Sequence, residues 1–349
     1  MRQDKIKFLK KGVVFVVALT VIILLLNLLY INLVQHNLIS YRKELLYTED
    51  LNTFKNKEIE FAFFGSSHLS FAINPSYINN SYNFGINHGN YIETYYKLRK
   101  IVEQDNLKVD TIVLELDLHT FSERFNEPQD RFSNLEVANE MVSLRKISEL
   151  REESFGSIIL KRYFPFLGDG ISLTESLIKK PKLTTLYFGW ERHATDFSKE
   201  ENRTKVAYAS YNDQFNKNEP RISGTSFVYF LKLIQYAKDN DINVIFIKYP
   251  VTKEYDEVIR NENITKEDYY TKIFTYVDDK LGEEYAVLDY YDLFFNDTKY
   301  FNDDDHLNYI GAEVFSKKVS DDLRNHSFSK EANFSRAEGS LISSENKDS

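Results

Sequence analysis

The longest run of hydrophobic positions lies near the N-terminus of the chain. Residues 12–34 form a stretch of 23 residues without a charged side chain, and about 20 residues of helix cross the hydrocarbon core of a bilayer. One acidic side chain, Asp4, and five basic ones precede this stretch: Arg2, Lys5, Lys7, Lys10 and Lys11. This excess of positive charge predicts that residues 1–11 lie in the cytoplasm and that the chain after the span lies outside. The run is longer than the apolar core of a signal peptide, about 7–15 residues, so we expect an uncleaved, single-pass signal anchor in the cell membrane.

Polar positions dominate two other segments. Residues 35–57 are charged and contain neither glycine nor proline, which favours a helical juxtamembrane stalk. Residues 326–349 are rich in serine, asparagine, glutamate and lysine, and we expect a disordered tail there. The folded domain is therefore expected between residues 58 and 325.

Short hydrophobic runs alternate with amphipathic stretches in this domain. Apolar runs bounded by glycine or proline predict buried strands, and apolar positions at helical spacing predict helices. The predicted strands are 61–64, 82–87, 111–118, 243–249 and 285–293, and the predicted helices are 92–104, 227–238, 266–281 and 309–324. The order strand, turn, helix, strand predicts an α/β fold with a mostly parallel central sheet and helices on its faces.

The segment 120–223 interrupts this pattern. It has few β-branched runs and reads as largely helical, with an amphipathic stretch over 137–151. Two interpretations are open. The insertion lies over the carboxyl edge of the sheet and caps a site there, or it is a peripheral helical subdomain that does not contact substrate.

Composition excludes several functional classes. The net charge is −9, and basic residues cluster only at the extreme N-terminus, which argues against a nucleic-acid-binding protein. The chain has no cysteine, so it has no disulfide, thiolate metal site or cysteine nucleophile.

Two distant stretches carry the candidate chemistry. Gly65-Ser66-Ser67 directly follows the first predicted strand, at the edge where open α/β sheets place their ligands. Far along the chain, Asp303 and His306 are three residues apart, so one loop can present both. A serine needs an adjacent base to act as a nucleophile, and a carboxylate orients that base. We therefore predict a catalytic triad of Ser67, His306 and Asp303.

A tetrahedral intermediate also needs hydrogen-bond donors for its oxyanion. The candidates are the backbone N–H of Ser67, the N–H of Gly85 and the side chain of Asn87.

The polar residues around the predicted triad have simpler interpretations. Ser66 is expected to be structural, and His68 to face solvent or the rim of the site. His88 and His119 are expected to be surface or internally satisfied histidines, and Asp304 and Asp305 to be solvated loop charges. The acidic stretch could hold a cation, but its spacing does not match an EF-hand loop. We expect neither a metal nor another cofactor.

These motifs resemble the blocks of the SGNH (GDSL-like) hydrolase superfamily. Gly65-Ser66-Ser67 resembles the first block, Gly85 the glycine of the second, and Asp303-x-x-His306-Leu307-Asn308-x-x-Gly311-Ala312 the last. The resemblance implies a three-layer α/β fold and serine esterase or O-acyltransferase activity. One block departs from the pattern. The third-block Gly-x-Asn-Asp is not evident, and residues 115–119 read Glu-Leu-Asp-Leu-His instead.

A similar departure occurs in membrane-anchored relatives that resemble DltD and the alginate-acetylation (AlgX/AlgJ-like) proteins. This resemblance implies acyl transfer on a cell-envelope polysaccharide or teichoic-acid-like polymer, beside a membrane-bound O-acyltransferase. Two alternatives are a general extracytoplasmic esterase or lipase, and a non-catalytic accessory protein of such an acyltransferase.

Overall fold

The structure is a computed structural model that describes residues 2–35, 54, 57–132, 135–164, 186–215, 222–262, 270–275, 277 and 285–325. The chain forms two compact units. One comprises Met1–Leu45 with Phe132–Thr184, and the other comprises Leu46–Arg131 with Thr185–Ser349. The stalk expected over 35–57 and the tail expected over 326–349 lie almost entirely outside the described residues.

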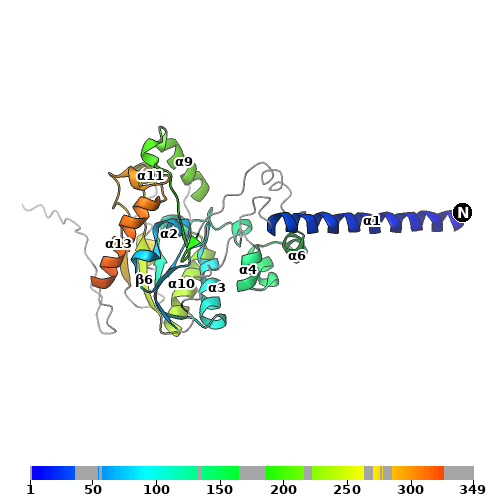
Figure 1. The fold of residues 1–349 in the computed structure, drawn as a ribbon, viewed down its shortest axis with the longest axis horizontal. Coiled ribbons are helices and arrows are strands. Elements are labelled where there is room, and N and C mark those ends of the chain that lie inside the picture. Colours follow the sequence, from blue (N-terminus) through cyan, green and yellow to red (C-terminus); the bar gives the residue numbers. More distant parts are fainter. Residues whose placement is uncertain are drawn as a thin grey trace, which may run out of the picture. The chain divides into compact units, whose positions relative to one another are not determined.

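The second unit is built on a five-stranded parallel sheet (Figure 1). Its strands are β1 (Glu58–Phe64), β2 (Ser81–Asn83), β3 (Lys108–Glu115), β6 (Asn243–Lys248) and β7 (Ala286–Asp289), in the spatial order β2-β1-β3-β6-β7. The α/β fold with a parallel central sheet is therefore confirmed. Each predicted strand is present, with bounds that differ by a few residues.

Helices cover both faces of this sheet. They are α2 (Ser67–Ala72) and α13 (Tyr309–Asn325) on one face, and α3 (Tyr91–Arg99) and α10 (Gly224–Asp239) on the other. Two further helices, α9 (Arg203–Gln214) and α11 (Lys253–Asn261), pack against each other. Alternate side chains of a strand point to opposite faces. On one face, Phe61 and Phe63 of β1 share a buried cluster with Leu69 of α2 and Phe315 of α13. On the other face, Phe230 of α10 packs against Tyr91 of α3 and Phe246 of β6.

Some predicted helices differ from the observed ones. The helix expected over 92–104 is α3 followed by a short π-helical stretch, Lys100–Gln104. The helix expected over 266–281 lies partly outside the described residues. Its described positions, 270–275 and 277, are helical. Helix α11 was not predicted, although Thr252 caps it by accepting a hydrogen bond from the N–H of Tyr255, three residues on.

Short elements complete this unit. They are the 3-10 helices η2 (Pro75–Tyr77), η4 (Leu118–Phe121), η5 (Pro128–Asp130), η6 (Phe197–Lys199) and η7 (Thr298–Tyr300), and an antiparallel pair, β4 (Leu186–Tyr187) and β5 (Trp190–Glu191).

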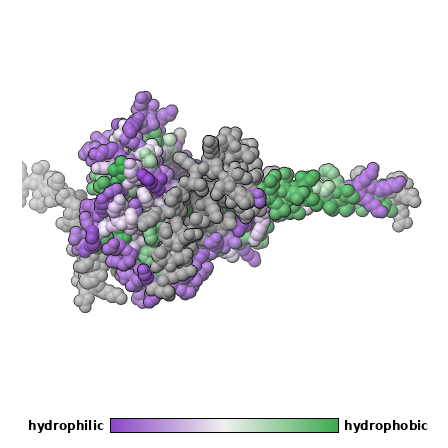
Figure 2. Space-filling model, in the orientation of Figure 1, coloured by the Kyte–Doolittle hydropathy of each residue, from purple (hydrophilic) through white to green (hydrophobic). Residues whose placement is uncertain are grey.

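Among its described residues, the first unit contains the long helix α1 (Arg2–Gln35) and the shorter helices α4 (Leu135–Met141), α5 (Leu144–Leu150) and α6 (Phe155–Tyr163). The amphipathic stretch over 137–151 therefore falls in two helices, α4 and α5, and Ser143 caps the second. Leu9–Leu29 of α1, with a mean hydropathy of 2.9, is long and apolar enough to cross a membrane. Figure 2 shows this helix hydrophobic along its span and hydrophilic near its N-terminal end.

Candidate active site

The turn between β1 and α2 positions Ser67. Strand β1 ends at Phe64, Ser66 caps α2, and Ser67 is the first residue of that helix. Gly65 has no room for a side chain, because an added Cβ would lie 2.1 Å from Oε2 of Glu115. Gly65 therefore allows the backbone to pass close to Glu115 between β1 and α2, at the carboxyl end of β1, where ligands of open α/β sheets bind.

The three residues predicted as a triad lie in contact. Nε2 of His306 is 2.8 Å from Oγ of Ser67, although 239 residues separate them in sequence. Nδ1 of the same ring is 2.9 Å from Oδ1 of Asp303, which also accepts the backbone N–H of His306. This arrangement can remove the proton of a serine hydroxyl and hold the resulting imidazolium.

Asn308 holds the loop that carries His306. Its Nδ2 donates to the carbonyls of residues 195, 299 and 301, and its Oδ1 accepts the N–H groups of Ile310 and Gly311 at the start of α13. Gly311 also allows close packing, because an added Cβ would lie 2.1 Å from the carbonyl oxygen of Tyr300. The loop is thereby tied to a helix N-terminus and to its own flanks.

The expectation that Asp304 and Asp305 are solvated loop charges is wrong. Their exposed fractions are 0% and 2%, because α9 packs against the loop and excludes water. Ser210 of α9 donates to Oδ1 of Asp304, and Gln214 donates to Oδ2 of Asp305 at 2.5 Å. Helix α9, which belongs to the 120–223 insertion, therefore packs against the loop that carries Asp303 and His306.

Asp305 also joins two imidazoles. Its Oδ1 lies 2.8 Å from Nδ1 of His306, and its Oδ2 lies 3.2 Å from Nε2 of His68. Only the Asp303 contact to His306 has hydrogen-bond alignment, so Asp305 acts on His306 mainly through its charge. This second carboxylate could not be identified from the sequence, since nothing in the Asp-Asp-Asp run distinguishes a buried residue from an exposed one.

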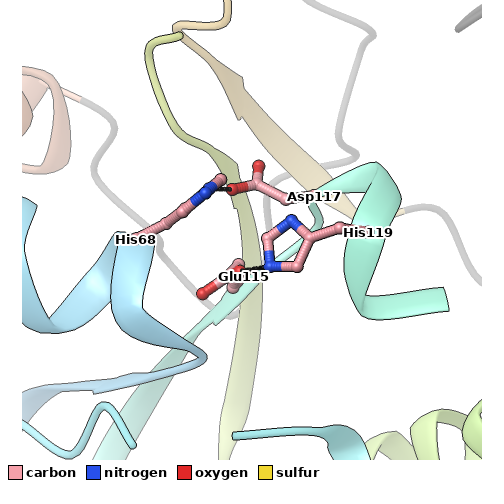
Figure 3. A group of neighbouring side chains, drawn as sticks. All are labelled: His68, Glu115, Asp117 and His119. Carbon is pink, nitrogen blue, oxygen red and sulfur yellow. Dashed lines mark hydrogen bonds and ion pairs between the residues drawn. The ribbon is translucent and has the colours of Figure 1, made fainter. Parts of the chain in front are cut away.

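His68 does not face solvent, contrary to expectation. It is 2% exposed, and its Nδ1 lies 2.6 Å from Oδ2 of Asp117. Figure 3 shows the two side chains meeting from α2 and from the segment after β3. Oδ1 of Asp117 accepts the backbone N–H of Tyr249, which follows β6. His68 is buried because α2 starts at the edge where β3 and β6 also end.

Glu115, at the end of β3, holds the serine turn. Its Oε2 accepts the backbone N–H of Ser66 at 2.6 Å, and its Oε1 accepts the Ser66 hydroxyl at 2.7 Å. Nε2 of His119 lies 3.2 Å from the same hydroxyl and 3.6 Å from Oε1 of Glu115 (Figure 3). Ser66 is therefore hydrogen-bonded to Glu115, and the buried His119 lies next to both of these residues. A carboxylate inside an otherwise apolar strand was the signal that could have identified Glu115.

The expected oxyanion donors differ in their surroundings. The N–H of Gly85 donates to Oδ1 of Asn83, so its role as an oxyanion donor stays a prediction that requires this bond to be shared or broken. One amide hydrogen of Asn87 is used by Glu191, and a role for the other stays a prediction. The Ser67 N–H lies in the first turn of α2, where N–H groups have no acceptor within the helix. It therefore stays the favoured donor.

Burial and charge shift several pKa values. Burial lowers the pKa of His306, but the charges of Asp303 and Asp305 outweigh it and hold the pKa well above its usual range. Burial also opposes a charge on His68, yet the hydrogen bonds to Asp117 and Asp305 raise its pKa to about 10. The pKa of Asp305 lies well below its usual range, because the two cationic imidazoles overcome the effect of burial.

Three other groups are shifted toward neutrality. Burial, reinforced by Asp117, raises the pKa of Glu115 to about 7. Burial, reinforced by Asp305 and Asp303, raises the pKa of Asp304 to about 8. Burial and the positive charge of His68 lower the pKa of His119 far below its usual value. Burial thus favours the neutral forms of Glu115, Asp304 and His119.

The side chains of His68, Glu115, Asp117 and His119 are close enough to share a metal ion, with one potential ligand atom from each within 4.8 Å of the others. Several of these potential ligand atoms already take part in hydrogen bonds within the protein. Glu115 binds the Ser66 turn, and Asp117 binds His68 and the Tyr249 N–H. The cluster therefore acts as a hydrogen-bonded support for the serine turn.

Comparisons with known proteins give distant structural likenesses. No protein-family model matches the sequence, and no curated protein sequence is significantly similar to it. Among solved structures, a "putative acylhydrolase" from Bacteroides fragilis matches with 11% identity and a TM-score of 0.36, covering 78% of this chain and 88% of its own. A GDSL-like lipase from Bacteroides thetaiotaomicron matches with 11% identity and a TM-score of 0.35, covering 85% of this chain and 97% of its own. Likenesses this distant carry no argument about activity, so the proposal below depends on the geometry of the site.

Proposed function

We propose that this protein is a serine-dependent acyl-transfer enzyme of the SGNH type, with Ser67 as nucleophile, His306 as base and Asp303 as the orienting carboxylate. One observation carries the proposal: the contacts from Ser67 Oγ to His306 Nε2 and from His306 Nδ1 to Asp303. A serine without a chemical role needs no imidazole beside its hydroxyl and no carboxylate hydrogen-bonded to that imidazole.

The proposed reaction runs in two halves. His306 takes the Ser67 proton as Oγ attacks the carbonyl carbon of an ester, and the N–H of Ser67 donates to the oxyanion. The tetrahedral intermediate expels the alcohol, which receives the proton from His306. An acceptor hydroxyl then attacks the acyl-Ser67 ester, His306 takes the acceptor's proton, and Ser67 recovers it on release. Water as acceptor gives hydrolysis, and a polymer hydroxyl gives transfer.

The proposed acceptor is a cell-envelope polysaccharide or teichoic-acid-like polymer. The apolar span of α1 and the basic residues before it support a membrane-anchored protein with its sheet unit outside the cell. An anchor keeps the site near envelope polymers and membrane-held acyl donors. A membrane-bound O-acyltransferase that supplies the acyl group is the partner proposed from the sequence resemblance.

Labelling with a serine-directed phosphonate tests the nucleophile. The full-length protein in detergent is treated with the probe, and the adduct is mapped by mass spectrometry. We expect label on Ser67, loss of labelling and of ester hydrolysis in Ser67→Ala, and unchanged labelling in the matched control Ser76→Ala, an exposed serine. Label on Ser66, or the same labelling in Ser67→Ala as in the wild type, would contradict the assignment. No labelling of any serine would favour the accessory-protein alternative.

A cellular measurement tests the acceptor. The alkali-labile acyl content of purified envelope polymers is compared between wild-type and Ser67→Ala cells. A lower content in the variant supports acyl transfer to the polymer. A higher content means that the enzyme removes acyl groups, and an unchanged content rejects polymer modification as the role of Ser67.

A further inference from the structure

Helix α6 presents an apolar face that the described part of the chain leaves exposed. At about 100° per residue, Phe155, Ile159, Tyr163 and Leu160 fall within an arc of about 140° on one side of the helix. Phe155 is 49% exposed, Tyr163 52% and Leu160 42%. The opposite side is anchored in the protein, since Ile158 is fully buried. A soluble helix of this size normally turns its apolar face inward.

The position of α6 beside α1 indicates what covers this face. Nδ2 of Asn27 in α1 donates to the backbone carbonyl of Tyr163, at the end of α6, over 2.9 Å. Asn27 is buried, whereas its neighbours on either side in α1 are exposed. The apolar span covers Leu9–Leu29, which is about 31 Å of helix and matches the hydrocarbon core of a bilayer. Asn27 lies in the outer part of this helix, two residues before Leu29 and seven residues, about 10 Å, before the end of the charge-free run 12–34. The carboxyl end of α6 therefore lies toward the outer boundary of the hydrocarbon.

This contact also satisfies a polar group that a lipid could not. An amide donor within a membrane span needs a protein acceptor, because hydrocarbon offers none. The carbonyl of Tyr163 is such an acceptor, and its own ring is of the kind enriched at membrane–water interfaces. The contact therefore places α6 and its exposed apolar face together at the membrane boundary.

We propose that α6 is an interfacial helix that lies in the outer headgroup region of the bilayer, with Phe155, Tyr163 and Leu160 in contact with lipid. The polar side of the helix fits this placement. Lys161 forms an ion pair with Glu153, and the guanidinium of Arg162 lies 5.5 Å from the ring centre of Tyr163. An apolar face bordered by basic and aromatic residues is the pattern of helices that lie on membranes. This inference rests on the proposed span of α1 and is independent of the chemistry at Ser67.

The absence of cysteine makes a labelling test direct, because one introduced cysteine is a unique site. Full-length Phe155→Cys and Leu160→Cys proteins carry a nitroxide and are reconstituted in phosphatidylcholine vesicles. The control is Glu149→Cys on α5, in the same unit, whose side chain is 57% exposed. Collision of each nitroxide with oxygen, which concentrates in lipid, is compared with collision with a water-soluble nickel chelate. Thermal unfolding of each variant checks that the fold is retained.

We expect the two α6 labels to favour oxygen over the nickel chelate by severalfold and the α5 label to show the reverse. Equal access of the nickel chelate to the α6 and α5 labels would overturn the proposal. In that case the face would be covered by a protein partner missing from the vesicles. Protection from both reagents would indicate a second copy of this chain on the face, and it would also overturn the lipid assignment. None of these outcomes depends on whether the phosphonate labels Ser67.

Discussion

The buried carboxylate of Asp305 leads to the sharpest prediction about this site. Asp305→Asn keeps the shape of the side chain and removes a charge that lies 2.8 Å from Nδ1 of His306 and 3.2 Å from Nε2 of His68. Two opposite charges at 2.8 Å attract each other by about 6 kcal/mol at an effective dielectric constant of about 20. The cost of burying the carboxylate cancels part of this, and removing one partner of a buried pair costs about 3–5 kcal/mol in total.

The two imidazoles share this loss. About half of it, roughly 2 kcal/mol, falls on the imidazolium of His306 in the transition state. This corresponds to about a 30-fold lower kcat/KM on the alkaline plateau of the pH profile, where His306 is neutral in the free enzyme. Asp303 keeps its hydrogen bond to the same nitrogen, so the loss is smaller than that of a triad member. The other half of the loss lowers the free energy of unfolding, because the buried imidazole of His68 then keeps Asp117 but not Asp305 as a carboxylate partner.

The pH profile separates this effect from a merely structural one. His306 must be neutral to act as a base, and Asp305 helps to raise its pKa. Removing the carboxylate lowers that pKa, so the acidic limb of kcat/KM shifts to lower pH in Asp305→Asn. The assay is hydrolysis of an activated small ester by the full-length protein in detergent between pH 5 and 10.

Asp304→Asn is the matched control. Asp304 is equally buried in the same loop, but its Oδ1 accepts from Ser210 and it touches neither imidazole. Its pKa is raised to about 8, so it is largely neutral at pH 7 and asparagine replaces it closely. We expect less than about a threefold change. An Asp305→Asn enzyme with the wild-type pH profile and rate would refute the argument, as would equal losses in both variants.

Three further predictions concern the support of the site. Glu115→Gln leaves one of the two Ser66 donors without an acceptor, so we expect the free energy of unfolding to fall by about 1–3 kcal/mol in urea titrations, together with slower phosphonate labelling; unchanged values would show that the turn holds itself. The pKa of His68 is raised to about 10, so the stability that His68 contributes is complete below about pH 6.5 and is lost as the pH rises toward 10; the melting temperature of the wild type should fall from pH 7 to 9.5, and a parallel fall in His68→Asn would contradict this cause. Gly311→Ala forces a Cβ against the carbonyl oxygen of Tyr300, and we expect the free energy of unfolding to fall by about 1–3 kcal/mol in urea titrations. Gly156→Ala is the control, because nothing lies within 4 Å of an added Cβ there.

The sequence by itself predicted the five strands of the sheet, several of the helices around them and the members of the candidate triad. Apolar runs of strand length ending in glycine or proline predicted the parallel sheet, because buried strands leave that pattern whatever surrounds them. The charge-free run of residues 12–34 predicted a helix suited to a membrane. Ser67 after the first strand and Asp303-x-x-His306 near the end of the chain predicted a site, because parallel strands bring their carboxyl ends to one edge.

Only the tertiary structure decided which polar residues are buried. His68, Asp304 and Asp305 look like solvated residues in the sequence, yet α2 and α9 enclose them. Burial depends on which elements pack together, and residues far apart in the chain make that choice. The same holds for Glu115, whose acceptor role depends on a turn 49 residues away, and for Gly85, whose N–H donates to a neighbouring side chain. Local patterns specify strands and helices, whereas charge pairs and hydrogen bonds across elements exist only once the chain has folded.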